Sequence, residues 1–374
     1  MTAGPPLVAV LGAGGAVGAA ATTVLQDLAV RAPLRLRVGA RTADRARRAA
    51  AVAGQGAEGR AVDATDPRSL AEFAEGCTLL LNCAGPATRL QQTVVRAAAA
   101  AGVHLVDAAD GSGAMAGRCA VFGAGLSPGL TGLLPRQLLG PSPAPGTRLT
   151  GYVGGLDHFT RSAALDYVAG LSASAEGAPL AGWRDGRRVE RALEPLSDVR
   201  LPYFPRRVVA RPFLSGETER LARTARLAAV DWYSVFDGPQ VLAALARLQP
   251  GAGPGELDAA ADAVSAAAEI DLFGRDAYQL LLLRCEGPAG SRELVLRAPG
   301  ASELTGALAA VAAVEVLAGR VPTGPHRAAE VLDPDTVTAV LAALPGISVR
   351  ESADEESTAT APPVAAEQVE EGRV

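Results

Sequence analysis

Four glycines near the N-terminus are spaced to bring the peptide backbone close to a phosphate group: Gly12, Gly14, Gly15 and Gly18. They follow the apolar run 7–11 and precede a segment of small residues with helical character. A strand, a tight glycine turn and a helix form the corner at which dinucleotide folds hold a pyrophosphate, because the first helical turn offers free N–H groups and a partial positive charge. Glycine permits the unusual φ angle after the strand and leaves room for the phosphates and for close helix–strand packing.

The spacing departs from the strict pattern G-x-G-x-x-G, because the last position of that pattern is Val17. Gly12, Gly15 and Gly18 fit G-x-x-G-x-x-G instead, a variant that is common in NADP-linked reductases. The alternative is an ordinary strand–turn–helix corner that binds no ligand. The end of the next strand helps to choose between the two.

The cofactor preference of such a corner depends on the residue that follows the second strand. The run 34–38 predicts this strand, and Gly-Ala-Arg-Thr follows it at 39–42. An acidic residue here would accept from the ribose hydroxyls of NAD and repel a 2′-phosphate, whereas the guanidinium of Arg41 can bind that phosphate through charge-assisted hydrogen bonds. Thr42 is adjacent, and Arg45 lies one helical turn further on. We therefore expect NADP; the alternative is that Arg41 is a solvated surface residue.

Few side chains in this sequence could donate a proton to a substrate. All 35 basic residues are arginines, so no lysine can act as a general acid and the tyrosine–lysine pair of short-chain dehydrogenases is excluded. His158 follows the run 148–156, the predicted first strand of a second domain, at the end expected to face a cleft. A histidine can donate near neutral pH unaided. We expect His158, with Asp157 or Tyr152 nearby, to orient or protonate the substrate; the alternative is a loop histidine without a role.

The elements that must position these residues alternate between strands and helices. Short apolar runs predict six strands, separated by segments of helical character. This rhythm predicts an α/β fold with a Rossmann-type doubly wound parallel sheet. The expected strands are 7–11, 34–38, 60–62, 77–81, 103–107 and 119–123, and the expected helices include one that begins at Ser127 and Pro128 and one over 301–318.

Three segments in this region carry a family resemblance. Asn-Cys-Ala-Gly-Pro occupies 82–86 at the end of the fourth strand, RAAAAAGVHLVDAADG occupies 96–111, and GAGLSPGLTGLL occupies 123–134. Together they resemble the saccharopine dehydrogenase-like reductases, a group that includes saccharopine reductase, carboxynorspermidine synthase and trans-acting enoyl reductases. The resemblance spans roughly residues 7–135 and, more loosely, 148–330.

The resemblance implies that a nicotinamide lies over Cys83–Pro86 and faces Asp107 and the turn 127–129. Ala84, Gly85 and Pro86 carry little side chain, which suits a strand end that a cofactor crosses. Leu105 stands where the family often has a tyrosine. The residues expected to bind NADP are Gly12, Gly14, Gly15, Ala16, Val17, Gly18, Arg41, Thr42, Asp63, Ala64, Cys83, Ala84, Gly85, Pro86 and Asp107.

The length of 374 residues suggests two domains. Residues 1–140 plus 300–348 are expected to form a discontinuous dinucleotide-binding domain, because the apolar helix over 301–318 should return to pack on it. Residues 147–299, with β-type runs and a hairpin signal, are expected to form a second α+β domain for substrate binding and dimerisation. The acidic segment 351–374, poor in large apolar residues, is expected to be a disordered tail.

Composition and charge argue against several classes of function. The net charge is −5, and 351–374 holds seven acids and one arginine, so the rest of the chain is nearly neutral and does not favour nucleic-acid binding. No secretory leader pattern and no apolar run of membrane length is evident, which favours the cytoplasm. The four cysteines lack C-x-x-C spacing, and no metal-ligand cluster stands out.

The sequence thus predicts an NADP-dependent reductase of the saccharopine dehydrogenase-like type, acting as a homodimer on a small-molecule or carrier-bound substrate. It would transfer hydride to a C=N or a polarised C=C bond. Two alternatives stay open. One is a carbonyl oxidoreductase on the Gfo/Idh plan, whose usual Glu-Lys-Pro motif is absent here, and the other is a non-catalytic NADP-binding sensor.

Overall fold

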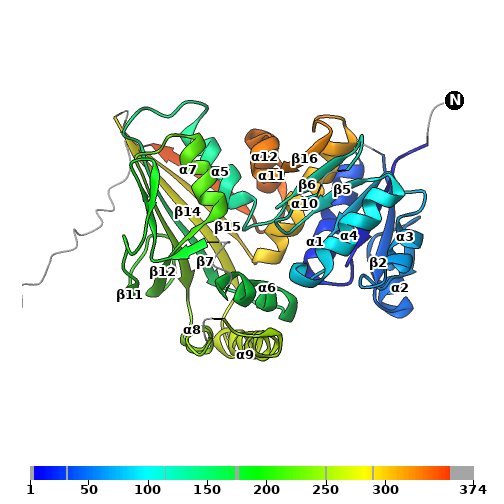
Figure 1. Cartoon of the computed structure of the whole chain (residues 1–374), viewed down its shortest axis with the longest axis horizontal. Helices are drawn as coiled ribbons and strands as arrows, with labels where there is room; N and C mark the ends of the chain where they lie inside the picture. The colour runs from blue at the N-terminus through cyan, green and yellow to red at the C-terminus, as the bar shows by residue number, and fades with distance from the viewer. Residues whose placement is uncertain are drawn as a thin grey trace, which may run out of the picture.

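The computed structural model describes residues 4–30, 33–113, 115–172, 177–248, 251–288 and 290–353. These residues form two halves, each built on one β-sheet, that lie side by side along the long axis of the molecule (Figure 1). The first half contains a parallel sheet and the second a mixed sheet.

The first sheet has seven strands, all parallel, in the order β16-β6-β5-β4-β1-β2-β3. Apart from β16, this is the 3-2-1-4-5-6 order of doubly wound dinucleotide-binding sheets, so the predicted fold class is confirmed. The strands are β1 (Leu7–Leu11), β2 (Arg35–Ala40), β3 (Glu58–Ala61), β4 (Leu79–Asn82), β5 (His104–Asp107), β6 (Cys119–Phe122) and β16 (Gly324–Arg327).

Both faces of this sheet are covered by helices, which explains why β1 is apolar at every position. Val8 and Val10 pack into a core shared with α1 and α10, whereas Ala9 and Leu11 point to the other face and pack with α3 and α4. All five side chains of β1 are buried. The helices of this half include α1 (Ala16–Ala29), α2 (Ala43–Val52), α3 (Pro67–Ala74), α4 (Ala87–Ala101) and α10 (Ala301–Leu317).

Helix α10 brings the chain back to the first sheet after the second half is complete. It packs along α1 so closely that a Cβ on Gly306 would lie 2.6 Å from the Cβ of Ala20. The helix ends at Leu317 with Ala318 as its C-cap, and Gly319 follows with φ of 71°, as expected of a residue just past a helix end. Strand β16 then pairs with β6, followed by α11 (Ala328–Val331) and α12 (Pro334–Ala343).

The helix after β6 begins later than predicted. The sequence suggested a start at Ser127 and Pro128, but α5 runs over Leu130–Leu139. The reason is Gly129, whose φ of +131° is incompatible with a helix and whose Cβ would meet Gly125 O at 2.1 Å. Residues 125–129 form a tight turn instead, and the N–H of Leu130, the first residue of α5, closes it by donating to Gly125 O.

The second sheet has ten strands in mixed orientation, and it belongs to the expected α+β half. Its main path is β10-β9-β13-β7-β14-β15-β17, with β12 pairing β13, β11 and β8. The strands are β7 (Arg148–Leu156), β8 (Gly177–Pro179), β9 (Gly182–Arg184), β10 (Arg187–Val189), β11 (Leu196–Val199), β12 (Val208–Ser215), β13 (Ala229–Phe236), β14 (Tyr278–Gly287), β15 (Gly290–Ala298) and β17 (Ser348–Ala353), and the helices are α6 (Arg161–Ser172), α7 (Gly216–Thr224), α8 (Pro239–Leu245) and α9 (Pro254–Leu272).

Two details of this sheet bear on the sequence predictions. The β9–β10 hairpin turns at Asp185-Gly186, where both φ angles are positive, as the sequence pattern predicted. The acidic tail was expected from residue 351, but residues 351–353 are the end of β17, which pairs antiparallel with the open edge of β15. The remaining predicted tail, 354–374, lies outside the described residues.

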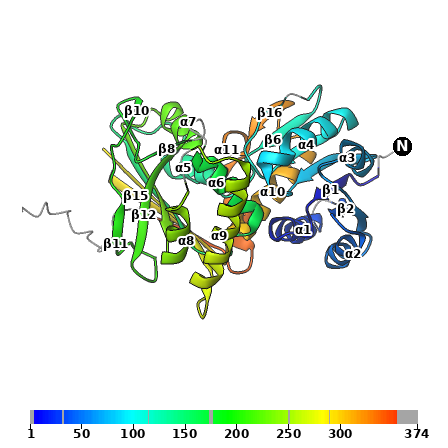
Figure 2. The same ribbon diagram turned by 60° about the horizontal axis from the view of Figure 1, so that its bottom comes forward.

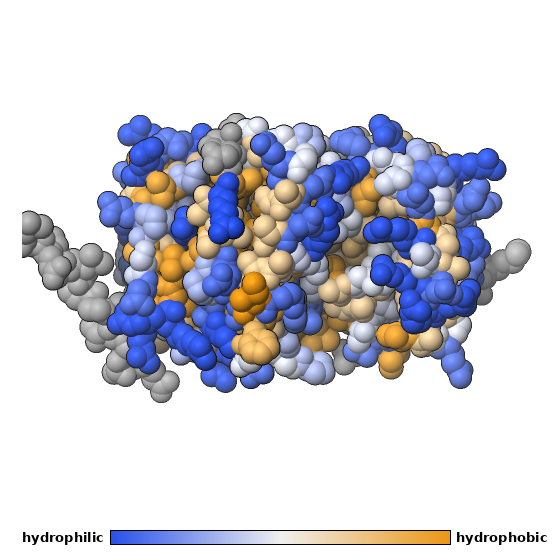
Figure 3. Space-filling view, turned by 90° about the horizontal axis from the view of Figure 1, so that it is seen from below, coloured by the Kyte–Doolittle hydropathy of each residue, from blue (hydrophilic) through white to orange (hydrophobic). Residues whose placement is uncertain are grey.

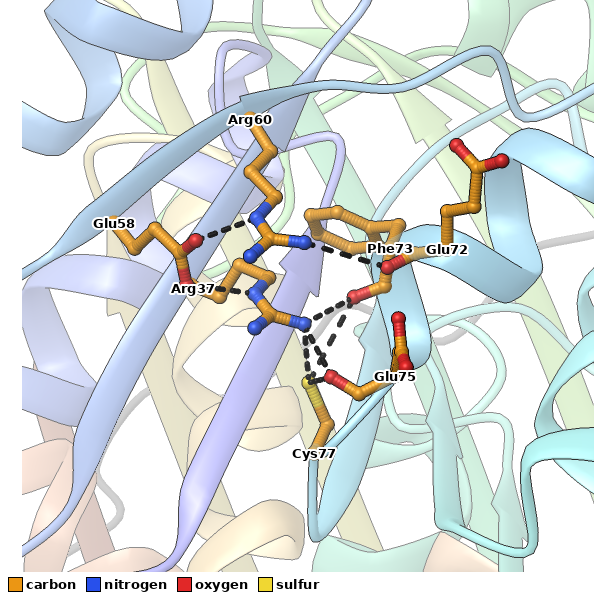
Figure 4. Close-up of polar contacts among 7 residues, drawn as sticks. All are labelled: Arg37, Glu58, Arg60, Glu72, Phe73, Glu75 and Cys77. Carbon is orange, nitrogen blue, oxygen red and sulfur yellow. Dashed lines mark hydrogen bonds and ion pairs between the residues drawn. The ribbon is translucent and has the colours of Figure 1, made fainter.

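A buried arginine ties three elements of the first half together (Figure 4). Arg37 of β2 pairs with Glu58 of β3 at 2.9 Å and donates to the carbonyl oxygens of Phe73 and Glu75 at 2.8 and 2.7 Å. Its Nη1 also lies 3.3 Å from Cys77 Sγ. The two carbonyls stand at the C-terminal end of α3, where the helix itself supplies no donors. Arg37 therefore holds α3 against the sheet.

Replacing Arg37 by methionine should lower the free energy of unfolding by roughly 3 kcal/mol, because it leaves the carbonyls of Phe73 and Glu75 without this donor and removes one of the two arginine partners of Glu58. Replacing Arg35, an exposed residue of the same strand, should change it by less than about 0.5 kcal/mol. Urea denaturation followed by circular dichroism measures both. Equal stabilities of the two variants would contradict the structural role of Arg37.

The surface contains hydrophilic residues at both ends of the molecule and hydrophobic patches between them on the face seen from below (Figure 3). The large apolar side chains with high exposure include Ile270 and Phe273 near the end of α9, which are 62% and 88% exposed. Among the described residues, no helix is both long and apolar enough to cross a membrane.

Candidate functional site

A cavity of about 1690 Å³ lies between the two halves. It opens along the carboxyl ends of the parallel strands and is lined from the other side by the second half, including α6, which lies between the second sheet and the helices of the first half in Figure 2. In doubly wound sheets, ligands bind outside the carboxyl ends of the strands where the strand order reverses, here between β1 and β4.

The glycine turn after β1 forms one wall of this cavity. Gly12 has φ of +81°, and a Cβ there would lie 2.8 Å from Ala84 N. Gly15 is the N-cap of α1, has no capping side chain, and lines the cavity with Gly14, Ala16 and Val17. The first N–H groups of α1 therefore face open space that a phosphate would fill.

Gly18 plays a different part from the other glycines. It does not line the cavity, and a Cβ at this position would lie 2.3 Å from Gly12 O. Its contribution is the close packing of α1 on the turn, which places the helix N-terminus at the cavity.

The ends of β2 and β3 form the next part of the wall. Arg41, Arg45, Asp63 and Ala64 all line the cavity. Thr42 does not: its Oγ1 accepts from the N–H of Arg45 and caps α2. This cap uses the Thr42 hydroxyl only as an acceptor and leaves its O–H free to donate, so cofactor binding by Thr42 stays a prediction.

The ends of β4 and β5 form the floor beyond the switch point. Asn82 Nδ2 donates to Asp107 Oδ2 at 3.0 Å, and Asn82 Oδ1 accepts from the N–H of Ala84 at 3.1 Å. Asp107 is 1% exposed, and its burial raises its pKa to about 6 against the opposing hydrogen bonds of Asn82 and Ala109. The segment 83–86 also lines the cavity, and burial raises the pKa of the Cys83 thiol to about 12, so this thiol stays protonated.

His158 and Asp157 lie at the second-half side of the cavity, after β7. His158 Nδ1 lies 2.8 Å from Glu269 Oε1 of α9, and this hydrogen bond raises the pKa of the imidazole despite slight desolvation. The Asp157 carboxylate accepts from the backbone N–H of Ala301 and of His158, so it caps the N-terminus of α10. The imidazole partner is thus Glu269 and not Asp157.

The structure does not bring Tyr152 to the cavity. Its strand neighbour Val153 lines the cavity, and successive side chains of a strand point to opposite faces. Tyr152 stacks on Tyr233 at a ring-centroid distance of 5.1 Å and packs into the core on the other side of the sheet. Its expected role beside His158 is therefore wrong.

Comparisons with known proteins agree with this geometry. Residues 8–120 match the family model of the saccharopine dehydrogenase NADP binding domain. The apo structure of the L-Glu-forming saccharopine dehydrogenase from Saccharomyces cerevisiae matches with a TM-score of 0.62 and 17% identity, over 93% of this chain and 99% of that one. Residues 8–120 are thus similar to the NADP-binding domains of saccharopine dehydrogenases, and the whole chain shares the fold of the yeast enzyme. The resemblance noted in the sequence is confirmed.

Other likenesses are local or absent. The triphenylmethane reductase of Citrobacter sp. is 31% identical over 28% of this chain and 37% of its own, with a TM-score of 0.24. No curated protein matches the sequence.

Three residues at the border of the NADP-binding domain were not singled out from the sequence: Glu217, Arg220 and Arg327. Glu217 of α7 is 9% exposed and accepts from Gly129 N–H at 2.8 Å and from the Thr131 hydroxyl at 2.6 Å. Burial raises its pKa to about 7, although these hydrogen bonds oppose the shift. An acid in the first turn of a helix is so common that nothing in the sequence marked it.

Replacing Arg41 by alanine in the NADP-binding domain should weaken the binding of NADPH by roughly 1–3 kcal/mol and leave the binding of NADH unchanged. The reason is that only NADPH carries the 2′-phosphate that loses a charge-assisted contact. Arg47 of the same helix region is exposed, pairs with Asp44 and lies outside the cavity lining, so its replacement by alanine is the matched control. Fluorescence titration measures both cofactors. Equal affinities for NADPH and NADH in the unmodified protein would end this assignment.

Among the described residues, no group of three or more His, Cys, Asp or Glu side chains is arranged to hold a metal ion.

Proposed function

We propose that this protein is an NADPH-dependent reductase that transfers hydride to a C=N or a polarised C=C bond of a small-molecule or carrier-bound metabolite. The observation that supports it most directly is one continuous cavity, which extends from Arg41 and the glycine turn, over residues 83–86, to Phe213 and Trp232 of the second half. A dinucleotide and a substrate can therefore share one cavity.

The residues of the NADP-binding domain fit such a cofactor. The glycine turn leaves space at the α1 N-terminus, Arg41 and Arg45 stand where a 2′-phosphate is expected, and the segment 83–86 offers a floor with small side chains. When bound, NADPH supplies the hydride. The protein has to orient the acceptor bond and provide one proton.

His158 is the proton donor that we propose. It lines the cavity from the substrate side, and its hydrogen bond with Glu269 favours the protonated ring that an acid needs. Asp157 acts through position: by capping α10 it fixes the backbone from which His158 projects. Asp107 and Glu217, whose pKa values are about 6 and about 7, are the residues against which this assignment is to be tested.

The test is a panel of imines, enoyl compounds and carbonyl compounds, with turnover followed by the loss of NADPH absorbance. We expect oxidation of NADPH with an imine or an enoyl compound. Turnover of carbonyl compounds alone would favour the carbonyl oxidoreductase, and NADPH binding with no turnover across the panel would favour the sensor.

We also propose that the protein acts as a cytoplasmic homodimer. Sedimentation velocity measures the oligomeric state, and a species with the mass of a single chain at working concentrations would contradict the dimer.

A further inference from the structure

Two arginines, one from each half of the molecule, meet around one carboxylate at the border of the cavity. Arg220 belongs to α7 in the second half, and Arg327 ends β16 in the NADP-binding domain. Asp110, which follows β5, lies between them: its Oδ2 is 3.9 Å from Arg220 Nη2 and its Oδ1 is 3.5 Å from Arg327 Nε. All three residues line the cavity.

The guanidinium groups have donors that the described residues do not satisfy. Nε and Nη2 of Arg220 and Nε of Arg327 are buried from solvent and have no hydrogen-bond partner within the described part of the chain. Asp110 and Glu330, the latter 3.6 Å from Arg220 Nε, lie beyond good hydrogen-bond distance. Buried N–H donors without acceptors are costly, so an acceptor group is expected here when the site is in use.

The position of this pair separates it from the cofactor phosphates. Arg327 follows β16 and Arg41 follows β2, and five strand spacings lie between these strands in the sheet, roughly 24 Å. The 2′-phosphate site and the Arg220–Arg327 pair therefore stand near opposite ends of the same row of strand ends. A dinucleotide phosphate held at Arg41 does not serve both.

The surroundings of the pair point to the substrate side of the cavity. Phe213 and Trp232 line the same cavity from β12 and β13, the strands that adjoin α7, so apolar side chains come from the same part of the molecule as Arg220. Apolar and cationic side chains of the second half therefore line the same cavity.

We propose that Arg220 and Arg327 bind an oxyanion group of the substrate, a carboxylate or a phosphoryl group, attached to a portion with apolar character. That the ligand is the substrate rests on the proposed reductase function; that the pair binds an oxyanion does not. Because the two arginines come from different halves, the bound anion also links the halves across the cavity. The Asp110 carboxylate lies next to both guanidinium groups and competes with the ligand for them.

The experiment uses the full chain saturated with NADP⁺, so that the 2′-phosphate site is filled. Glutarate and inorganic phosphate are titrated separately by isothermal calorimetry. We expect one of them to bind, with affinity at least tenfold lower in Arg220→Met and in Arg327→Met, and several-fold higher in Asp110→Asn, which removes the competing carboxylate. Arg68→Met is the control, because Arg68 is exposed and lies outside the cavity.

The two probes distinguish a carboxylate from a phosphoryl ligand. Unchanged binding in both arginine variants, with folding verified by thermal melts, would overturn the proposal. Weaker binding in Asp110→Asn would also overturn it, since it would show that the arginines and Asp110 form a closed ion-pair network. Probe binding without NADPH turnover would overturn the reductase and keep the site, whereas turnover of uncharged substrates without probe binding would do the reverse.

Discussion

Replacement of Gly15 by valine should abolish NADPH binding while the protein stays folded. The backbone of Gly15 has φ of −95°, which any residue adopts, and a Cβ there would meet Gly12 O at 3.4 Å, an ordinary contact. The rest of the valine side chain would extend toward the space at the N-terminus of α1, where a pyrophosphate needs close approach to backbone N–H groups. Fluorescence titration measures the loss of NADPH binding, and circular dichroism measures whether the protein stays folded.

Two further glycine variants make this result specific. Gly255→Ala on α9 has no atoms within 4 Å of the added Cβ and should leave cofactor binding unchanged. Gly18→Val should unfold the domain instead, because its Cβ would lie 2.3 Å from Gly12 O. A folded Gly15→Val protein that binds NADPH normally would place the phosphate site elsewhere.

Replacement of His158 by alanine should lower kcat by about 10²–10⁴-fold, the range typical of general acid catalysis, and leave NADPH affinity unchanged. His158 lines the substrate side of the cavity and does not belong to the glycine turn or to the ends of β2 and β3. Stopped-flow measurement of NADPH oxidation, with a substrate found in the panel, separates turnover from binding.

The pH dependence gives an independent measure of the same assignment. An acid must be protonated to act, so the rate should fall as pH rises through the pKa of His158. The hydrogen bond with Glu269 raises this pKa. In the Glu269→Gln variant, the decrease of the rate with rising pH should therefore begin at lower pH.

Asp107 and Glu217 are the alternative proton donors, and their variants test the assignment of His158. Full turnover in His158→Ala together with loss of turnover in Asp107→Asn or Glu217→Gln would assign the proton to one of those carboxyls. A pH–rate profile that is unchanged in Glu269→Gln would show that the pH dependence has another origin.

Local patterns in the sequence were enough for most of the NADP-binding domain. The run Leu7–Leu11, the glycine turn and Arg41 lie within a short stretch of chain, so their spacing determines which of them reach one strand end. The β9–β10 hairpin was equally predictable, because Asp185-Gly186 specifies a turn with positive φ angles. Where the local geometry is unusual, as at Gly129, the predicted helix start was wrong.

The second side of the site depended on contacts between residues far apart in the chain. The partner of His158 is Glu269, more than a hundred residues away, and no spacing rule connects them. Tyr152 was assigned to the site by proximity in sequence, yet strand alternation turned it to the opposite face.

The sequence by itself determined that the chain forms a doubly wound sheet with a glycine corner suited to NADP, because strands, turns and helix ends follow from neighbouring residues. Only the tertiary structure decided which side chains of the second half face that corner. Glu217, Arg220 and Arg327 meet the cavity because α7 packs beside α5 and because α10 returns the chain to place β16 next to β6. Such placements are set by the packing of whole elements, and a list of residues along one chain does not contain them.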